Sequence, residues 1–162
     1  MLARQALAVL EARMVNVSRF DPLTQRLNSN VWAWSSVTTY QRALATAQHV
    51  VPGFDPSRHP VPVKVNPAVE ACVLRGERVV VPFEQIAAGT VNPWVIRLAR
   101  ALMALEWTVS VPVIVSGAVI GTFAAHFSHR PTDVQVQLAQ TYADEFSLLL
   151  PGGSPPPGPK PA

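Results

Sequence analysis

Cysteine is nearly absent from this sequence, since Cys72 is the only one among 162 residues. A single cysteine cannot close a disulfide within the chain, and it cannot support redox chemistry that needs a second thiol. Cys72 lies in the largely apolar run Ala68–Val73, where a thiol is normally buried and unreactive. We therefore expect a cytoplasmic chain with no cysteine nucleophile.

Charge is also scarce, because only 14% of the residues are charged while 49% are hydrophobic. The formal net charge is +3, but the basic residues are scattered singly and form no stripe, so we expect no nucleic-acid partner. A surface with few charges leaves apolar area that a second molecule can cover. The composition therefore favours association.

Long hydrophobic runs are missing. The most apolar stretch, residues 109–125, is interrupted by Pro112 and by the pair Ser116-Gly117, and it falls short of the roughly 20 apolar residues that span a bilayer. The first 14 residues include charged side chains and have no cleavage site typical of a signal peptide. We expect no membrane partner.

The last twelve residues, 151–162, consist of Pro, Gly, Ser, Ala and one Lys. Such a segment cannot bury enough apolar surface to fold. The sequence therefore predicts one domain over residues 1–150, followed by a disordered tail rich in proline and glycine.

Hydrophobic periodicity predicts an α+β fold with an antiparallel sheet of about five or six strands. Asn66-Pro67 and Asn92-Pro93 are typical helix starts, with a capping side chain before a proline in the first turn. The expected elements are a helix (2–14), strands (14–20, 27–34), a short helix or irregular strand (38–50), a proline-rich loop (52–67), a helix (67–74), a strand (78–81), a helix (93–105), strands (106–115, 118–127) and a closing helix (132–150).

The last two strands form a predicted hairpin whose register can be derived. If Ser116 and Gly117 are the turn residues, Val115 pairs with Ala118, and Ser110 then faces Phe123. Side chains alternate across a strand, so one face of this hairpin mixes hydroxyls with aromatic rings. Its members are Thr108, Ser110, Phe123, Ala125 and Phe127. This mixture is typical of a small-molecule pocket.

The same hairpin resembles the GAF family. Ser110-Val111-Pro112-Val113 and Gly117-Ala118-Val119-Ile120-Gly121-Thr122 are similar to the family's strand signature, and Pro131-Thr132-Asp133 precedes the closing helix at the expected distance. The resemblance extends over residues 2–150. It implies terminal helices on one face of the sheet and a ligand site on the other, beneath shorter helices and loops.

The resemblance also implies which residues would meet a ligand. Tetrapyrrole-binding relatives place serines on the strand where Thr108 and Ser110 stand, and Trp94 opens the helix that would cover the site. The predicted ligand-binding residues are Thr108, Ser110, Phe123, Phe127 and Trp94.

Ligand identity stays open, and so does any cofactor. GAF domains bind cyclic nucleotides, tetrapyrroles, haem or small metabolites. The Asn-Lys-Phe and Asp-Glu signature of phosphodiesterase-type members is absent here, and Val73, not histidine, follows Cys72, unlike plant-type bilin attachment sites. The family's methionine sulfoxide reductases need several cysteines, so we expect no enzyme and no catalytic residues.

A metal site is not expected either. His126 and His129 are three residues apart on a strand and the loop after it, where such residues point in opposite directions. We interpret His126 as a partly buried residue of the sheet and His129 as a solvated one.

Two functions remain open. The first is a cytoplasmic domain of a bacterial-type signalling protein that senses a small molecule or transmits a partner's state. It would form a homodimer through helices 2–13 and 132–150 and act on an output domain or a partner kinase. The second is a ligand-free dimerisation scaffold whose own side chains fill the pocket.

Overall fold

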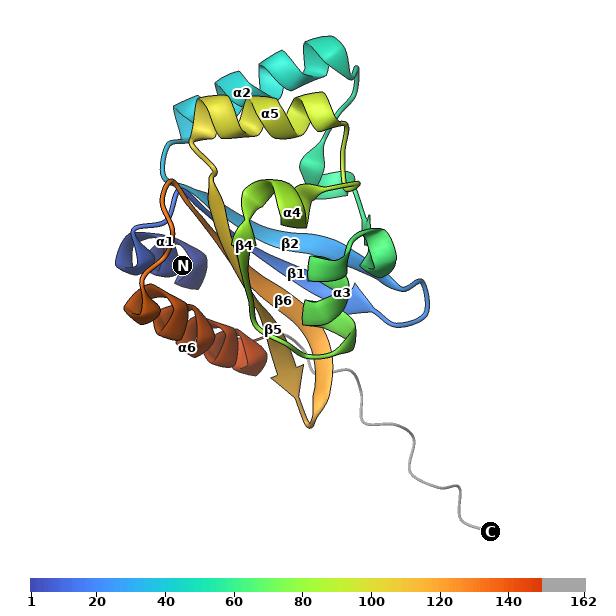
Figure 1. Cartoon of the computed structure of the whole chain (residues 1–162), viewed down its shortest axis with the longest axis vertical. Coiled ribbons are helices and arrows are strands. Elements are labelled where there is room, and N and C mark those ends of the chain that lie inside the picture. The colour runs from blue at the N-terminus through green and yellow to red at the C-terminus, as the bar shows by residue number, and fades with distance from the viewer. Residues whose placement is uncertain (150–162) are drawn as a thin grey trace.

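A computed structural model describes residues 1–149, so the predicted tail at 151–162 lies outside the described residues. Its sheet has six strands in the order β3-β2-β1-β6-β5-β4, and every neighbouring pair is antiparallel. The elements, drawn in Figure 1, are α1 (Leu2–Leu10), β1 (Met14–Asp21), β2 (Arg26–Trp34), α2 (Val37–Val50), the 3-10 turn η1 (Pro56–Arg58), β3 (Val61–Pro62), the 3-10 turn η2 (Val63–Val65), α3 (Pro67–Leu74), β4 (Val79–Pro82), α4 (Phe83–Ala87), α5 (Pro93–Met103), β5 (Trp107–Val115), β6 (Ala118–Phe127) and α6 (Asp133–Leu149). The α+β prediction is confirmed.

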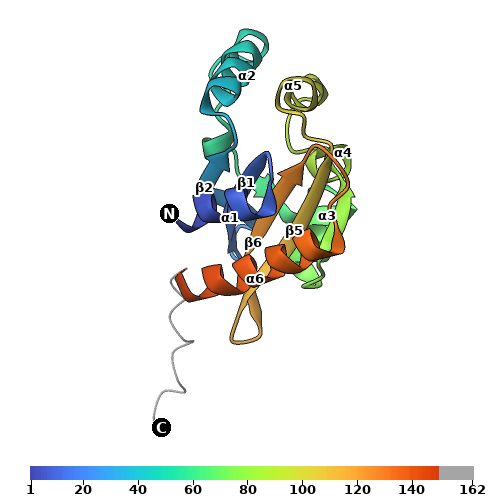
Figure 2. The ribbon, with the colours of Figure 1, turned by 90° about the vertical axis from the view of Figure 1, so that its left-hand side faces the viewer.

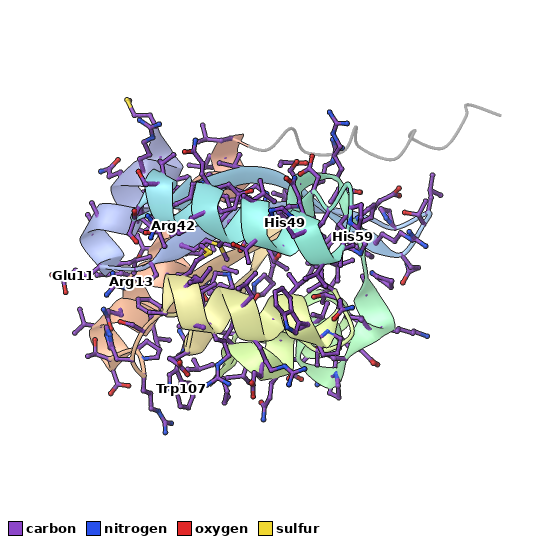
Figure 3. All side chains as sticks on the ribbon, turned by 90° about the horizontal axis from the view of Figure 1, so that it is seen from above. Glu11, Arg13, Arg42, His49, His59 and Trp107 are labelled. Carbon is purple, nitrogen blue, oxygen red and sulfur yellow. The ribbon has the colours of Figure 1, made fainter. Side chains whose placement is uncertain are left out.

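The helices divide between the two faces of the sheet. α1 and α6 pack on one face, where they bury an apolar core with β1, β5 and β6 (Figure 2). The other face is covered by the helices between β2 and β5, and α2 and α5 lie side by side among them (Figure 3). This arrangement is the one expected from the GAF resemblance.

Local capping explains where the covering helices begin. The side-chain oxygen of Asn66 accepts a hydrogen bond from the Val69 amide at 3.0 Å, and that of Asn92 accepts one from the Trp94 amide at 2.9 Å. Both predicted helix starts are confirmed. The undecided segment 38–50 is the helix α2, which begins after Ser36, whose hydroxyl accepts from the Thr39 amide.

Besides the two 3-10 turns, one short strand and one short helix were not predicted. β3 contains only two residues, and it joins the sheet by pairing Val61 with Leu27. α4 spans five residues immediately after β4. Neither is long enough to show a hydrophobic period, so only the tertiary structure reveals them.

At the tip of the hairpin the register is as predicted, but farther along the strands it is shifted by one residue. Ser116 and Gly117 form the turn, and Val115 pairs with Ala118 as expected. A β-bulge then shifts the pairing between Val113 and Ile114, so that Ser110 lies opposite Ala124. The predicted pairing of Ser110 with Phe123 is wrong, because one extra residue moves every later side chain of β6 to the other face.

Among residues 1–149, no helix is both long and apolar enough to cross a membrane.

Candidate ligand-binding cavity

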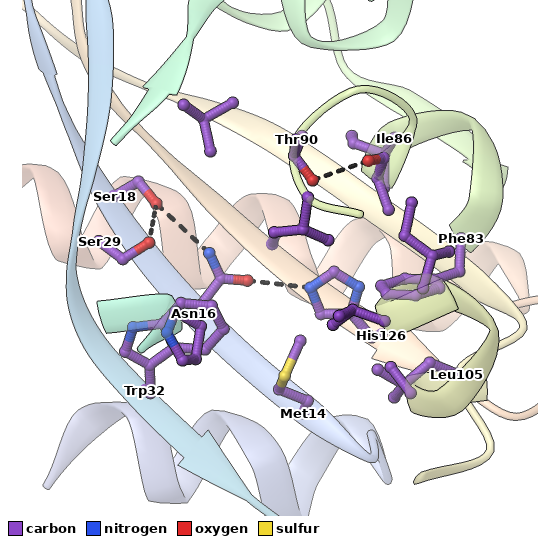
Figure 4. Close-up of a pocket in the computed structure, with 18 of the residues that line it drawn as sticks. Met14, Asn16, Ser18, Ser29, Trp32, Phe83, Ile86, Thr90, Leu105 and His126 are labelled. Carbon is purple, nitrogen blue, oxygen red and sulfur yellow. Dashed lines mark hydrogen bonds between the residues drawn. The ribbon is translucent and has the colours of Figure 1, made fainter. Parts of the chain in front are cut away.

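A cavity of about 240 Å³ lies between the sheet and the helices α2, α3, α4 and α5 (Figure 4). Its floor comes from β1, β2, β5 and β6, and most of its lining is apolar. Terminal helices α1 and α6 contribute no lining residue. The cavity is therefore on the face where the GAF resemblance places a ligand.

A row of hydrogen-bonded polar side chains crosses this floor. The Thr108 hydroxyl bonds Nδ1 of His126 at 2.8 Å, and Nε2 of His126 lies 2.9 Å from the side-chain oxygen of Asn16. The Asn16 amide donates to the Ser18 hydroxyl at 3.3 Å, and Ser18 shares a hydrogen bond with Ser29 at 3.2 Å. Four of these residues line the cavity, whereas Thr108 is fully buried behind His126.

His126 is held in its neutral form. Burial lowers the pKa of its imidazole to about 3, because the charged ring would lose its hydration. With the Asn16 oxygen as acceptor, Nε2 carries the hydrogen, and Nδ1 accepts from the Thr108 hydroxyl. Both ring nitrogens are thus occupied, so His126 acts as a fixed neutral polar group at neutral pH.

We expect His126 to make stability depend on pH. Its pKa is about 3 in the folded state against 6.5 when unperturbed, so between these values the unfolded chain binds a proton that the folded chain excludes. The free energy of unfolding should rise with pH across this window, by up to about 1.4 kcal/mol per pH unit from this group. The side chains that hydrogen-bond to the ring or pack edge-on against it, those of Thr108, Asn16 and Phe83, do not titrate.

The comparison of wild type with His126→Gln isolates this contribution. Urea denaturation at several pH values from 5 to 7.5 should give a clearly flatter dependence for the variant. Parallel curves for the two proteins would show that the pKa of His126 is the same in the folded and unfolded states, so that burial does not lower it.

Cys72 is buried and faces the floor from α3. Its sulfur lies 3.4 Å from the Ser110 hydroxyl, and burial raises the pKa of the thiol to about 11. With this pKa, the thiol is protonated at neutral pH. Because the thiolate is the nucleophilic form, Cys72 is a poor nucleophile. The prediction that Cys72 is a buried thiol is confirmed.

An aromatic ladder forms one wall of the cavity. The rings of Trp32 and Trp34 stack at 5.1 Å, and that of Tyr40 on α2 stacks on Trp34 at 3.6 Å. Within residues 1–149, the indole N–H of Trp32 is buried and has no hydrogen-bond partner. A buried donor without a partner costs about 1–3 kcal/mol, so this wall contains one unsatisfied hydrogen-bond donor.

An ion-pair cluster holds α5 over the cavity. The guanidinium of Arg100 bonds the carboxylate of Glu84 on α4 and, at 2.7 Å, that of Glu106 just before β5. These side chains are partly exposed, so the pairs contribute modestly to stability. They nevertheless connect α5 to α4 and to the residue that precedes β5.

The structure brings together only part of the predicted site. Ser110 lines the cavity, and Thr108 bonds a residue that lines it. The prediction that Phe123 and Phe127 share this face is wrong, because the bulge turns both toward α1 and α6, where they are fully buried. Trp94 is 38% exposed and does not line the cavity, although Val95 and other residues of α5 do.

Sequence reasoning missed the polar residues of β1. Asn16 and Ser18 alternate with the buried Val15 and Val17, so a two-residue period was present in the sequence. It indicates a strand with one apolar face and one polar face. Only the pairing of β1 with β6 shows that the polar face meets His126 inside a cavity.

Residues 1–149 contain no group of three or more His, Cys, Asp or Glu side chains positioned to hold a metal ion. His129 is exposed, as expected for a solvated residue. His126 is more deeply buried than predicted, with 5% of its surface exposed.

No family sequence model and no curated protein sequence matches this chain. Solved structures do. The GAF domain/HD domain protein from Geobacter sulfurreducens is similar with a TM-score of 0.63 at 15% identity, over 91% of this chain and 86% of that one. The second GAF domain of DevS from Mycobacterium smegmatis gives 0.56 at 16% identity, with the same coverage.

A domain of a putative two-component sensor histidine kinase from Sinorhizobium meliloti is similar with a TM-score of 0.53 at 17% identity, over 91% of this chain and 84% of that one. These identities are low, so the likeness concerns the fold. The sheet order, the terminal helices on one face and the cavity on the other agree with it. The chain has the fold of a GAF domain.

Proposed function

We propose that this chain is a non-catalytic sensory domain that binds a small molecule in the cavity and transmits its presence through α1 and α6. The observation that carries the proposal is the cavity itself, an apolar space of about 240 Å³ with a row of polar side chains across its floor. Apolar walls with a few fixed polar groups are typical of ligand sites. A protonated Cys72 and a doubly hydrogen-bonded neutral His126 favour binding over catalysis.

The similar structures support a role in signalling. They include domains of a sensor histidine kinase and of a methyl-accepting chemotaxis protein, in which a domain of this fold is part of a larger signalling chain. We infer that this domain likewise acts on an output domain or a partner kinase in the cytoplasm.

The sheet offers a physical route for transmission. Along β1, Asn16 and Ser18 face the cavity while Val15 and Val17 pack in the core beneath α1 and α6. A ligand that shifts the polar row therefore moves a strand whose opposite side contacts the terminal helices. Close-packed cores pass on such shifts because they have little free volume.

Filling the cavity tests ligand binding. Ala99 of α5 lines the cavity, whereas Ala101 of the same helix is exposed. With a panel of neutral, anionic and cationic metabolites in a thermal-shift assay, we expect at least one compound to stabilise wild type and Ala101→Phe but not Ala99→Phe. The reason is that phenylalanine at position 99 occupies the ligand's space.

The same assay separates the sensor from the scaffold. If no compound of any charge raises the melting temperature of wild type, while Ala99→Phe is itself more stable, the cavity is a packing defect and the ligand-free scaffold is favoured.

We also propose that the domain forms a homodimer through its terminal helices. Apolar side chains remain exposed on both, including Val9 at 49%, Val134 at 68% and Leu148 at 84%. Their burial against a second copy would stabilise a dimer, and the sparse surface charge opposes it little.

Analytical ultracentrifugation at micromolar concentration should show a dimer for wild type and a monomer for the double variant Val134→Lys/Leu148→Lys. Leu102→Lys, at an exposed position on α5, is the control and should remain dimeric. A wild-type monomer would refute the proposal.

A further inference from the structure

The cavity lacks charge. Within residues 1–149, no Lys, Arg, Asp or Glu side chain lines it, although α2 and α5 both carry arginines. Arg42 and Arg97 are exposed, and Arg100 is paired with Glu84 and Glu106 (Arg42 is labelled in Figure 3). The charges of the covering helices are therefore outside the site.

The titratable groups that do line the cavity are neutral as well. These are His126, whose pKa is about 3, Cys72, whose pKa is about 11, and Tyr40, whose pKa is raised by burial. A carboxylate, phosphate or ammonium group bound here would lose its hydration and meet no opposite charge. Buried charges are stable only when they are paired, so the lining selects against charged ligands.

The size and shape of the cavity narrow the chemical class of the ligand further. An apolar cavity of about 150 Å³ accommodates benzene, and this one has a volume of about 240 Å³. Trp32, Trp34 and Tyr40 line one wall with their rings stacked on one another, so the stack offers the cavity ring edges and those faces that the stacking leaves uncovered. Aromatic rings pack favourably on such surfaces, so a molecule of two fused rings fits the space and its wall.

The polar row adds a single hydrogen-bonding region. Asn16, Ser18, Ser29 and His126 lie together on the floor, and the Ser110 hydroxyl lies across from Cys72 (Figure 4 shows the row). Hydroxyls can both donate and accept, so an uncharged amide, ketone or hydroxyl on the ligand finds a partner here.

We propose that the cavity binds an uncharged aromatic molecule of about two fused rings that carries one hydrogen-bonding group. This inference rests on the proposed function, and it names the chemical class of the ligand. It excludes ligands that would have to bury a carboxylate or a phosphate in the cavity.

A pair of probes with the same shape tests the role of charge. Naphthalene-2-carboxamide is neutral, and naphthalene-2-carboxylate is an anion at pH 7.5. By isothermal titration calorimetry with the full chain, we expect the carboxamide to bind with a micromolar dissociation constant and the carboxylate at least about 100-fold more weakly, because its charge would be desolvated without a partner. 2-Naphthylmethylamine, a cation at this pH, should be weak for the same reason.

Two variants locate the binding. Ala99→Phe should abolish the carboxamide signal, while Ala101→Phe should leave its affinity within twofold of wild type. Circular dichroism confirms that each variant is folded.

Tryptophan fluorescence gives a second measurement of binding. Trp94 and Trp107 do not line the cavity, so in the double variant Trp94→Phe/Trp107→Phe the remaining tryptophans, Trp32 and Trp34, report the ligand by fluorescence.

Equal or tighter binding of the carboxylate, or carboxamide binding that survives Ala99→Phe, overturns the inference and leaves the sensory proposal standing. If the carboxamide does not bind while a charged metabolite from the panel does, the inference about the ligand class is overturned and the sensory proposal stands. Failure of every compound overturns both.

Discussion

Phe123→Ala is expected to destabilise the fold by about 3–5 kcal/mol, the range for truncating a buried phenylalanine in a core. Phe123 is fully buried on the terminal-helix face, where its ring stacks on those of Tyr142 and Phe146 of α6 at 6.2 and 5.7 Å. Truncation removes these contacts and leaves a cavity between the sheet and α6. Urea denaturation of the variant and wild type measures the difference.

Ile114→Ala is the matched control on the same hairpin. Ile114 is 47% exposed, so its truncation should change stability by less than about 1 kcal/mol. Because Phe123 lies on the face opposite the cavity, its loss should leave carboxamide affinity unchanged where the variant is still folded. A small effect of Phe123→Ala on stability, or a selective loss of binding, would contradict the placement of this ring.

Gly121→Ala should be at least as damaging as a core truncation, with an expected loss of about 3 kcal/mol or more. A Cβ atom at this position would lie 2.2 Å from the backbone oxygen of Ser18 on β1. Backbone atoms of a paired strand cannot move aside, so β1 and β6 would have to separate beside the β-bulge. A loss of this size lowers the melting temperature by about 10 °C, which calorimetry detects readily.

Gly117→Ala provides the comparison at the hairpin tip. A Cβ at Gly117 meets nothing within 4 Å, but its φ of +80° is unfavourable for alanine, so we expect a loss of only about 1 kcal/mol. Equal effects at the two glycines would show that β1 does not approach β6 as closely as the structure indicates.

The sequence alone determined the features that depend on local chemistry. Asn66-Pro67 and Asn92-Pro93 start helices because an amide side chain caps the free backbone N–H groups and proline fits the first turn. Ser116-Gly117 makes the hairpin because both residues adopt positive φ. The burial of Cys72 likewise follows from its apolar neighbours along the chain.

Tertiary structure decided which side chains of β6 face the cavity and which face the terminal helices. It therefore decided which residues make up the site. The bulge between β5 and β6 lies next to Gly121, where the backbone of β1 approaches β6 closely, a contact between segments about a hundred residues apart. That single inserted residue placed Phe123 and Phe127 in the core and His126 on the floor of the cavity. Alternation along the strands predicts which side chains share a face only while the pairing has no bulge. No local pattern in the hairpin reveals this bulge, because it lies beside a third strand, β1, that is distant in the sequence.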